Sequence, residues 1–170
     1  MILIERSTLL NRLRNLRGTP DIKIITGIRR SGKSQLMKDF MDRIRVAEPD
    51  VNIIAVDYVD LAFENLKEYH ALYRYIEDHY ISGRENFLFI DEVQMCPGFE
   101  LAVNSLHASG RYEIYLTGSN AFLLSNDLAT LFTGRFLEIH VFPFSFREFR
   151  DYYGGRFEME VSPSRCCQKS

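Results

Sequence analysis

The stretch that most constrains the fold of this chain is IKIITGIRRSGKS, at residues 22–34. Its first five residues have the length and composition of a buried strand. A glycine, four variable residues, a second glycine and a Lys-Ser pair follow. Apolar residues then recur at helical spacing, at Leu36, Met37, Phe40 and Ile44. The chain must therefore pass from a strand through a glycine-dependent loop into a helix, as α/β proteins do.

Four further apolar runs alternate with helical patterns. We predict strands at 51–58, 86–92, 112–120 and 135–142. We predict helices at 7–16, from about residue 33, at 99–107, at 121–132 and at 145–153, with helical spacing also from Leu66 to Tyr80. Because the strand runs are apolar on both faces, they predict a mostly parallel five-stranded sheet with helices on both faces, a three-layer α/β fold.

Length and composition favour one domain. The chain has 170 residues, of which 46% are hydrophobic, enough for one core. We place the domain at 1–158 and expect 159–170, which lacks periodicity, to be a disordered tail. No run approaches the roughly 20 apolar residues that a membrane helix needs, and the N-terminus does not read as a signal peptide. We therefore expect a cytoplasmic protein with no membrane partner.

Positive charge is concentrated near the N-terminus. Residues 1–38 contain nine Lys and Arg against two acidic residues, which is +7, although the whole chain carries −2. A basic end can indicate nucleic-acid binding, but a phosphate site beside an amphipathic helix recruits the same charge. We favour the phosphate site and leave nucleic acid open as a partner.

The pattern G-x-x-x-x-G-K-S has the spacing of a phosphate-binding loop, the Walker A motif of P-loop proteins. Its glycines let backbone N–H groups turn toward phosphates, and the helix start adds its positive end. Lysine reaches the terminal phosphates as a point charge, and serine offers a hydroxyl to Mg²⁺. We expect the lysine to be a surface charge in the empty loop. The nucleotide-binding candidates are Gly27, Ile28, Arg29, Arg30, Ser31, Gly32, Lys33 and Ser34.

Two consecutive arginines occupy the middle of this loop. Side chains at the variable positions of such a loop mostly face away from the nucleotide, so we do not expect Arg29 and Arg30 to grip the phosphates. They either raise the local positive potential and pair with carboxylates, or present guanidinium groups to another partner.

An acidic pair follows the third predicted strand. FLFIDE ends in Asp91 and Glu92, and ligands of open α/β sheets bind at the carboxyl ends of strands. Asp91 is a candidate Mg²⁺ ligand, usually through water, together with Ser34. Glu92 is a candidate general base for an attacking water, which favours hydrolysis over transfer to a second substrate.

Two more sites complete the set of candidates. LTGSN closes the fourth predicted strand, and its Thr117, Ser119 and Asn120 could sense the terminal phosphate, or could form only a polar turn. Arg135 precedes the fifth strand and could stabilise transition-state charge, in its own chain or from a neighbouring subunit, or form only a salt bridge. The guanine-reading N-K-x-D pattern is absent, which favours ATP over GTP.

These motifs together resemble a known family. GIRRSGKS, FLFIDEVQ, LTGSN, TGR and PFSFREF, in this order, are similar to segments of AAA-like ATPases of bacteria and archaea that carry a C-terminal domain of unknown function. The resemblance covers residues 1–155. It implies a sheet of order 5-1-4-3-2, ATP as ligand, Arg135 as the arginine of the family's GR motif, and loop arginines as a family feature.

The chain departs from that family after FREF, where members continue into a helical region and a second domain. We therefore expect an N-terminal ATPase core without its usual C-terminal half. The predicted function is Mg²⁺-dependent ATP binding and hydrolysis. A nucleotide-binding regulatory module with negligible turnover and a small-molecule phosphotransferase are the alternatives. A homo-oligomer and a protein partner both stay open.

Overall fold

The computed structural model describes residues 6–119, 132 and 134–143. Along these residues the regular elements are α1 (Ser7–Asn15), β1 (Ile22–Thr26), α2 (Lys33–Ala47), β2 (Asn52–Asp57), η1 (Leu61–Leu66), α3 (Tyr69–Asp78), β3 (Asn86–Asp91), η2 (Val93–Met95), α4 (Phe99–Ala108), β4 (Tyr112–Thr117) and β5 (Phe136–His140). Apart from Phe132, the helices predicted at 121–132 and 145–153 and the predicted tail lie outside the described residues.

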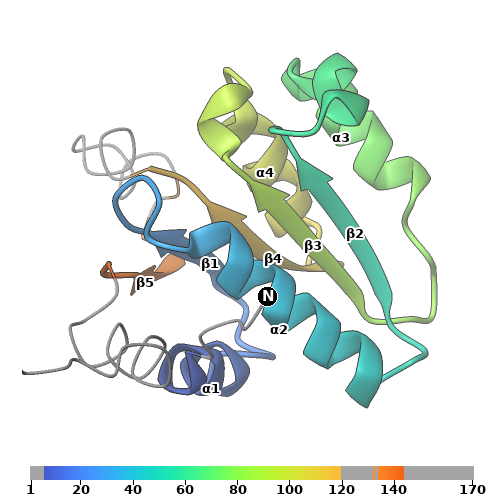
Figure 1. The fold of residues 1–170 in the computed structure, drawn as a ribbon. Helices are drawn as coiled ribbons and strands as arrows, with labels where there is room; N and C mark the ends of the chain where they lie inside the picture. Colours follow the sequence, from blue (N-terminus) through green and yellow to red (C-terminus); the bar gives the residue numbers. More distant parts are fainter. Residues whose placement is uncertain (1–5, 120–131, 133, 144–170) are drawn as a thin grey trace, which may run out of the picture. The chain divides into compact units, whose positions relative to one another are not determined.

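The five strands form one sheet in the order β2-β3-β4-β1-β5. Every pair of neighbours is parallel. Counted from β5, this is the order 5-1-4-3-2, so the predicted order is confirmed. Because all strands run the same way, their carboxyl ends lie along one border of the sheet, the carboxyl edge, and their amino ends lie along the other, the amino edge (Figure 1). The carboxyl edge places Asp57 at the end of β2 directly beside Asp91 at the end of β3.

Helices cover both faces of the sheet, and each face has its own core (Figure 1). On one face α1 and α2 pack through Leu13 and Phe40 against Phe89 and Tyr115 of the strands. On the other face α3 and α4 pack their apolar residues against β2, β3 and β4. Neighbouring residues of β1 alternate between the two cores, with Ile24 in one and Ile25 in the other. The predicted three-layer arrangement is therefore confirmed.

Burial along the strands follows their place in the sheet. Every residue of β1 and β3 is buried, as an apolar run predicts for a covered parallel strand. The edge strands β2 and β5 are only partly buried, because each has a neighbour on one side alone. The helix in the region of helical spacing from Leu66 to Tyr80 is shorter than that spacing predicted, since Leu66 ends η1 and α3 stops at Asp78.

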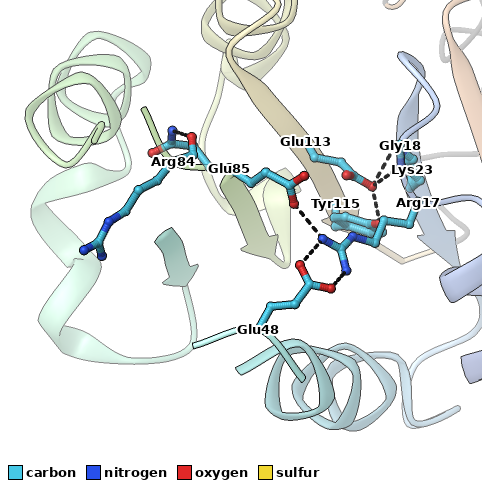
Figure 2. A network of polar contacts seen from close by, with 9 residues as sticks. Arg17, Gly18, Lys23, Glu48, Arg84, Glu85, Glu113 and Tyr115 are labelled. Atoms are coloured by element: carbon cyan, nitrogen blue, oxygen red, sulfur yellow. Dashed lines mark hydrogen bonds and ion pairs between the residues drawn. The ribbon is translucent and has the colours of Figure 1, made fainter. Parts of the chain in front are cut away.

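A polar network ties the helices to the amino edge of the sheet (Figure 2). Arg17, just after α1, donates to both carboxylate oxygens of Glu48 and to Glu85, 2.6 Å away. Glu113 of β4 accepts from Lys23, at 3.2 Å, and from the hydroxyl of Tyr115, at 2.6 Å. Burial lowers the pKa of Lys23, and the nearby Glu113 carboxylate opposes that change.

This network accounts for part of the basic N-terminus. Six of the nine cations in residues 1–38 bond to groups of the chain itself, namely Arg6, Arg12, Arg17, Lys23, Lys33 and Lys38. Their partners are backbone carbonyls or carboxylates. Two thirds of these cations are therefore engaged in contacts within the chain.

No helix in the described part of the chain combines the length and apolarity that crossing a membrane requires.

Candidate nucleotide-binding site

The loop between β1 and α2 depends on backbone conformations that glycine allows. Gly27 has φ 152°, and a Cβ there would lie 2.3 Å from the carbonyl oxygen of Val141. A side chain at this position would therefore force β5 away from β1. Gly32, at φ 90°, precedes the first residue of α2. The glycines of the motif thus allow a close passage beside β5 and a sharp entry into the helix.

Lys33 is the residue for which the sequence-based expectation was wrong. We expected a surface charge, but its side chain is only 4% exposed. Its ammonium donates to the carbonyl oxygens of Gly27, at 3.0 Å, and Ile28, at 3.1 Å. The Ile28 carbonyl also accepts the N–H of Ser31, at 3.2 Å, so the loop turns back on itself around the lysine. Lys33 therefore bridges the start of the loop and the start of α2.

The variable positions of the loop divide into exposed and buried residues. Ile28, Arg29 and Arg30 are exposed, and Arg30 has a positive φ of 65°, a backbone conformation that L residues rarely adopt. Ser31 is buried, and its hydroxyl has no hydrogen-bond partner within the described residues. Both arginines are exposed, but only Arg30 lines the pocket described next, so the two do not share one environment.

An open pocket of ≈ 300 Å³ lies against the start of α2. Its lining combines cations, a hydroxyl and one carboxylate: Arg30, Gly32, Lys33, Ser34, Gln35, Lys38 and Glu92. Residues from the loop, from α2 and from the end of β3 thus meet around one space. Positive groups and the amino end of a 15-residue helix suit an anion there.

Asp91 is buried beside this pocket, at 1% exposure. The hydroxyl of Thr117, at the end of β4, donates to its carboxylate. Burial raises the pKa of Asp91, hydrogen bonds from Thr117 and Ser34 lower it, and the charges of Asp57 and Glu92 raise it further. A desolvated carboxylate beside the Ser34 hydroxyl is a hard oxygen donor of the kind that Mg²⁺ prefers.

These oxygens fit a metal only together with further ligands. Within the described residues, no group of three or more His, Cys, Asp or Glu side chains is arranged to hold a metal ion. Mg²⁺ typically keeps waters and binds through one or two protein groups plus substrate phosphates. Ser34 and Asp91 match that incomplete donor set.

Glu92 lines the pocket from the turn after β3. It is one of two non-glycine residues with positive φ in the described part of the chain, at 56°. Its backbone N–H donates to the Thr117 hydroxyl oxygen at 3.0 Å, and its carboxylate accepts from Gln94. The unusual backbone conformation sends the carboxylate to the pocket while Asp91, one residue earlier, stays buried.

Two of the remaining candidates, Thr117 and Ser119, do not line the pocket. Thr117 uses its hydroxyl on Asp91 and Glu92, so it holds the acidic pair. Ser119 is partly buried just past the end of β4, and Asn120 lies outside the described residues. The Thr117 contacts were not predicted. The sequence signal that could have revealed them is a hydroxyl residue at the end of the fourth strand, at the same level as Asp91 at the end of the third.

Arg135 lies at the amino edge of the sheet, whereas the phosphate loop lies at the carboxyl edge. Its carbonyl accepts from the N–H of Ile22, the first residue of β1, and its own N–H donates to Phe132. The loop begins after the last residue of β1. Five residues of strand separate the two edges, roughly 16 Å at about 3.3 Å per residue. Arg135 is exposed there, and within one chain the structure does not bring it to the loop.

Comparison with known proteins agrees with this geometry. Residues 19–150 match a protein family described as an AAA domain. The chain belongs to this family. The match begins between α1 and β1, so the AAA domain as the family defines it contains the loop, the acidic pair and all five strands.

Two curated relatives come from a bacterium and an archaeon. An uncharacterized protein of Haemophilus influenzae is 37% identical over 151 residues, covering 86% of this chain and 37% of the relative. An uncharacterized protein of Methanocaldococcus jannaschii is 29% identical over 151 residues, covering 85% of this chain and 32% of the relative. The chain therefore spans about a third of the length of the curated relatives it matches.

Solved structures share the fold at low sequence identity. A DNA polymerase III gamma subunit-related protein of Thermotoga maritima aligns with a TM-score of 0.62 and 16% identity, over 86% of this chain and 49% of that one. AMPPCP-bound DnaA of Aquifex aeolicus aligns with a TM-score of 0.57 and 18% identity, over 91% of this chain and 51% of that one. The AAA domain thus shares the P-loop fold of these proteins.

Proposed function

We propose that this chain binds MgATP in the pocket at the start of α2 and hydrolyses it. The observation that carries the proposal is the convergence of Lys33, Ser34 and Glu92 from two separate segments onto one pocket, with Asp91 buried beside it. Family membership and an AMPPCP-bound structural neighbour support a nucleotide as the ligand. The absence of N-K-x-D favours adenine over guanine.

Each residue has a role that follows from its chemistry. The loop amides and the amino end of α2 bind phosphate oxygens. When the nucleotide binds, the Lys33 ammonium leaves the two loop carbonyls and contacts the terminal phosphates instead, as a point charge can. Ser34 and Asp91 would hold Mg²⁺, which would neutralise charge on the phosphates when bound. Glu92 orients a water and accepts its proton, because its carboxylate reaches the pocket while Asp91 is desolvated.

Ser119 and Asn120 follow the strand beside β3, and we propose that they sense the terminal phosphate. Arg135 would supply transition-state charge from a neighbouring copy, since its own loop is at the far edge of the sheet. This assigns the chain a homo-oligomeric active form.

A single-turnover assay tests the hydrolysis. The purified chain in excess over radiolabelled ATP should release phosphate in the presence of Mg²⁺, whereas Glu92→Gln should bind MgATP and release almost none. Gln94→Leu is the companion variant, because it removes the donor that holds the Glu92 carboxylate but keeps the carboxylate itself, so it should release more phosphate than Glu92→Gln. Equal phosphate release by parent and Glu92→Gln would remove Glu92 from the mechanism.

A nucleotide-binding module with negligible turnover is the second candidate. The position of Arg135 favours it for an isolated chain, because this arginine lies at the opposite end of β1 from the loop of its own copy. Tight MgATP binding without phosphate release, at every protein concentration, would support this candidate over the ATPase.

A further inference from the structure

Arg6 is a buried arginine that lies before the segment matched by the AAA family. It immediately precedes α1, and the family match begins only at residue 19. Arginine is almost never fully buried unless its charge is partnered, and Arg6, only 8% exposed, is accordingly partnered, in part by the phosphate loop. Its place beside the phosphate loop therefore calls for an explanation that the family motifs do not supply.

The guanidinium of Arg6 reaches into the loop itself. Its Nη1 donates to the carbonyl oxygen of Ser31 at 3.0 Å, in a buried contact between residues 25 positions apart. Ser31 lies between the two left-handed residues Arg30 and Gly32. The helix ladder starts one residue later, where the carbonyl of Gly32 accepts from Leu36. The Ser31 carbonyl therefore lies outside the helix ladder and is oriented by Arg6.

That contact also sets the direction of one backbone donor. The peptide bond between Ser31 and Gly32 is planar and trans, because the described residues contain no cis peptide. In a trans peptide the carbonyl and the following N–H point in opposite directions. With the Ser31 oxygen held toward Arg6, the Gly32 N–H points away from Arg6. Gly32 lines the pocket proposed for the phosphates.

We propose that Arg6 is a positioning residue for nucleotide binding, which fixes the Ser31–Gly32 peptide so that the Gly32 N–H is presented to a phosphate group. Arg6 itself does not touch the nucleotide. The segment before the matched domain thereby becomes part of the phosphate site. This inference rests on the proposed nucleotide-binding function.

The test compares Arg6→Met with Arg12→Met. Both arginines belong to the α1 segment and both donate to a backbone carbonyl, Arg12 to Glu138 of β5 at 3.3 Å. Calorimetry with MgATP, MgADP and adenosine measures the consequence. We expect Arg6→Met to lose about 10- to 100-fold in affinity for both phosphorylated ligands, the scale of one hydrogen bond to a charged group. Arg12→Met should bind them as the parent does, and adenosine affinity should not change in either variant.

A second arm separates positioning from charge. Arg6→Lys keeps the charge but loses the planar guanidinium that orients the carbonyl, so it should recover only part of the loss. The deficit of Arg6→Met should persist at high salt, where long-range attraction is screened. Full recovery by Arg6→Lys, with a deficit that disappears at high salt, would overturn the positioning role.

A third readout does not depend on nucleotide. In chain labelled with ¹⁵N-glycine, Arg6→Met should shift or broaden the Gly32 amide signal of the ligand-free protein, and Arg12→Met should not. If the parent binds no MgATP, the proposed function fails, and this amide signal still decides whether Arg6 sets the peptide. An unchanged Gly32 signal in folded Arg6→Met, or unchanged MgATP affinity, would overturn the inference. Far-UV circular dichroism verifies that each variant is folded.

Discussion

Thr117, the last residue of β4, donates its hydroxyl hydrogen to the carboxylate of Asp91, the last residue of β3. The same oxygen accepts the backbone N–H of Glu92 at 3.0 Å. One hydroxyl on the neighbouring strand therefore fixes both members of the acidic pair. Adjacent residues of the sequence are thereby directed to different environments, Asp91 into the protein and Glu92 toward the pocket.

Replacing Thr117 by valine should destabilise the protein by about 1–3 kcal/mol. Valine keeps the shape but leaves a buried carboxylate and a backbone N–H without their partner. Urea unfolding measures the difference. Thr19→Val is the control, because its hydroxyl also bonds within the chain, to the carbonyl of Leu16 at 2.7 Å, but in a partly buried turn. An unfolding midpoint equal to that of the parent would show that the Thr117 contacts contribute little.

Asp91→Asn should separate stability from metal binding. Burial, the largest cause, raises the pKa of Asp91. A raised pKa means that the folded state holds the proton more tightly than the unfolded state. The stability contributed by Asp91 therefore increases as the pH falls from its raised pKa toward the ordinary value of 3.8, and the ionised carboxylate costs stability above that window. At neutral pH the asparagine variant should be no less stable than the parent.

The same variant should bind ATP about 10- to 100-fold more weakly in Mg²⁺, and the Mg²⁺ dependence should largely disappear. Chemical unfolding between pH 4 and 7 and calorimetry with and without Mg²⁺ measure the two effects. A variant that unfolds more easily at neutral pH than at pH 4, relative to the parent, would contradict the stability argument. An unchanged Mg²⁺ requirement would contradict the metal role.

Lys33→Ala should weaken both nucleotide binding and the loop. Its ammonium holds two loop carbonyls in a buried position, so its loss should cost about 1–3 kcal/mol of stability. Lys38→Ala is the control for charge near the pocket, since Lys38 is 51% exposed and pairs with Asp57 at 3.2 Å. An exposed pair contributes about 1 kcal/mol or less. If both alanine variants unfold alike, the buried bridge of Lys33 does not stabilise the loop.

Much of the fold followed from local patterns. The alternation of apolar runs with helical spacing predicted the covered parallel sheet, and the resemblance of motifs such as FLFIDEVQ to the family supplied the strand order. The loop between Gly27 and Ser34 was recognisable because its geometry depends on glycines at fixed spacing. These features are properties of short stretches of sequence.

Contacts between distant segments were not predictable in the same way. The burial of Lys33 depends on how the loop folds back, and the bonds of Thr117 and Arg6 join residues 26 and 25 positions apart. The position of Arg135 could have been inferred. In a parallel sheet, a residue before a strand lies at the edge opposite to residues that follow strands, so Arg135 and the loop after β1 must be apart.

Because Arg135 is distant from the loop of its own chain, we expect it to act on the loop of a neighbouring copy. A cation supplied by a neighbour accelerates phosphoryl transfer by about 10³ to 10⁵. If Arg135 acts on the loop of another copy, the isolated chain should hydrolyse ATP slowly and its specific activity should rise with protein concentration. Arg135→Ala should lower kcat without weakening MgATP binding, because the loop of each chain is intact.

Mixing two inactive variants decides between the arrangements. Arg135→Ala retains Glu92, and Glu92→Gln retains Arg135, so an interface between the two chains would contain one complete site. The mixture should therefore recover part of the parent activity if the arginine acts between chains. If the mixture is inactive and the specific activity of the parent does not depend on concentration, Arg135 must reach the loop of its own chain, which would require a rearrangement of β5. Full activity of Arg135→Ala alone would reduce this residue to a surface cation at the amino edge of the sheet.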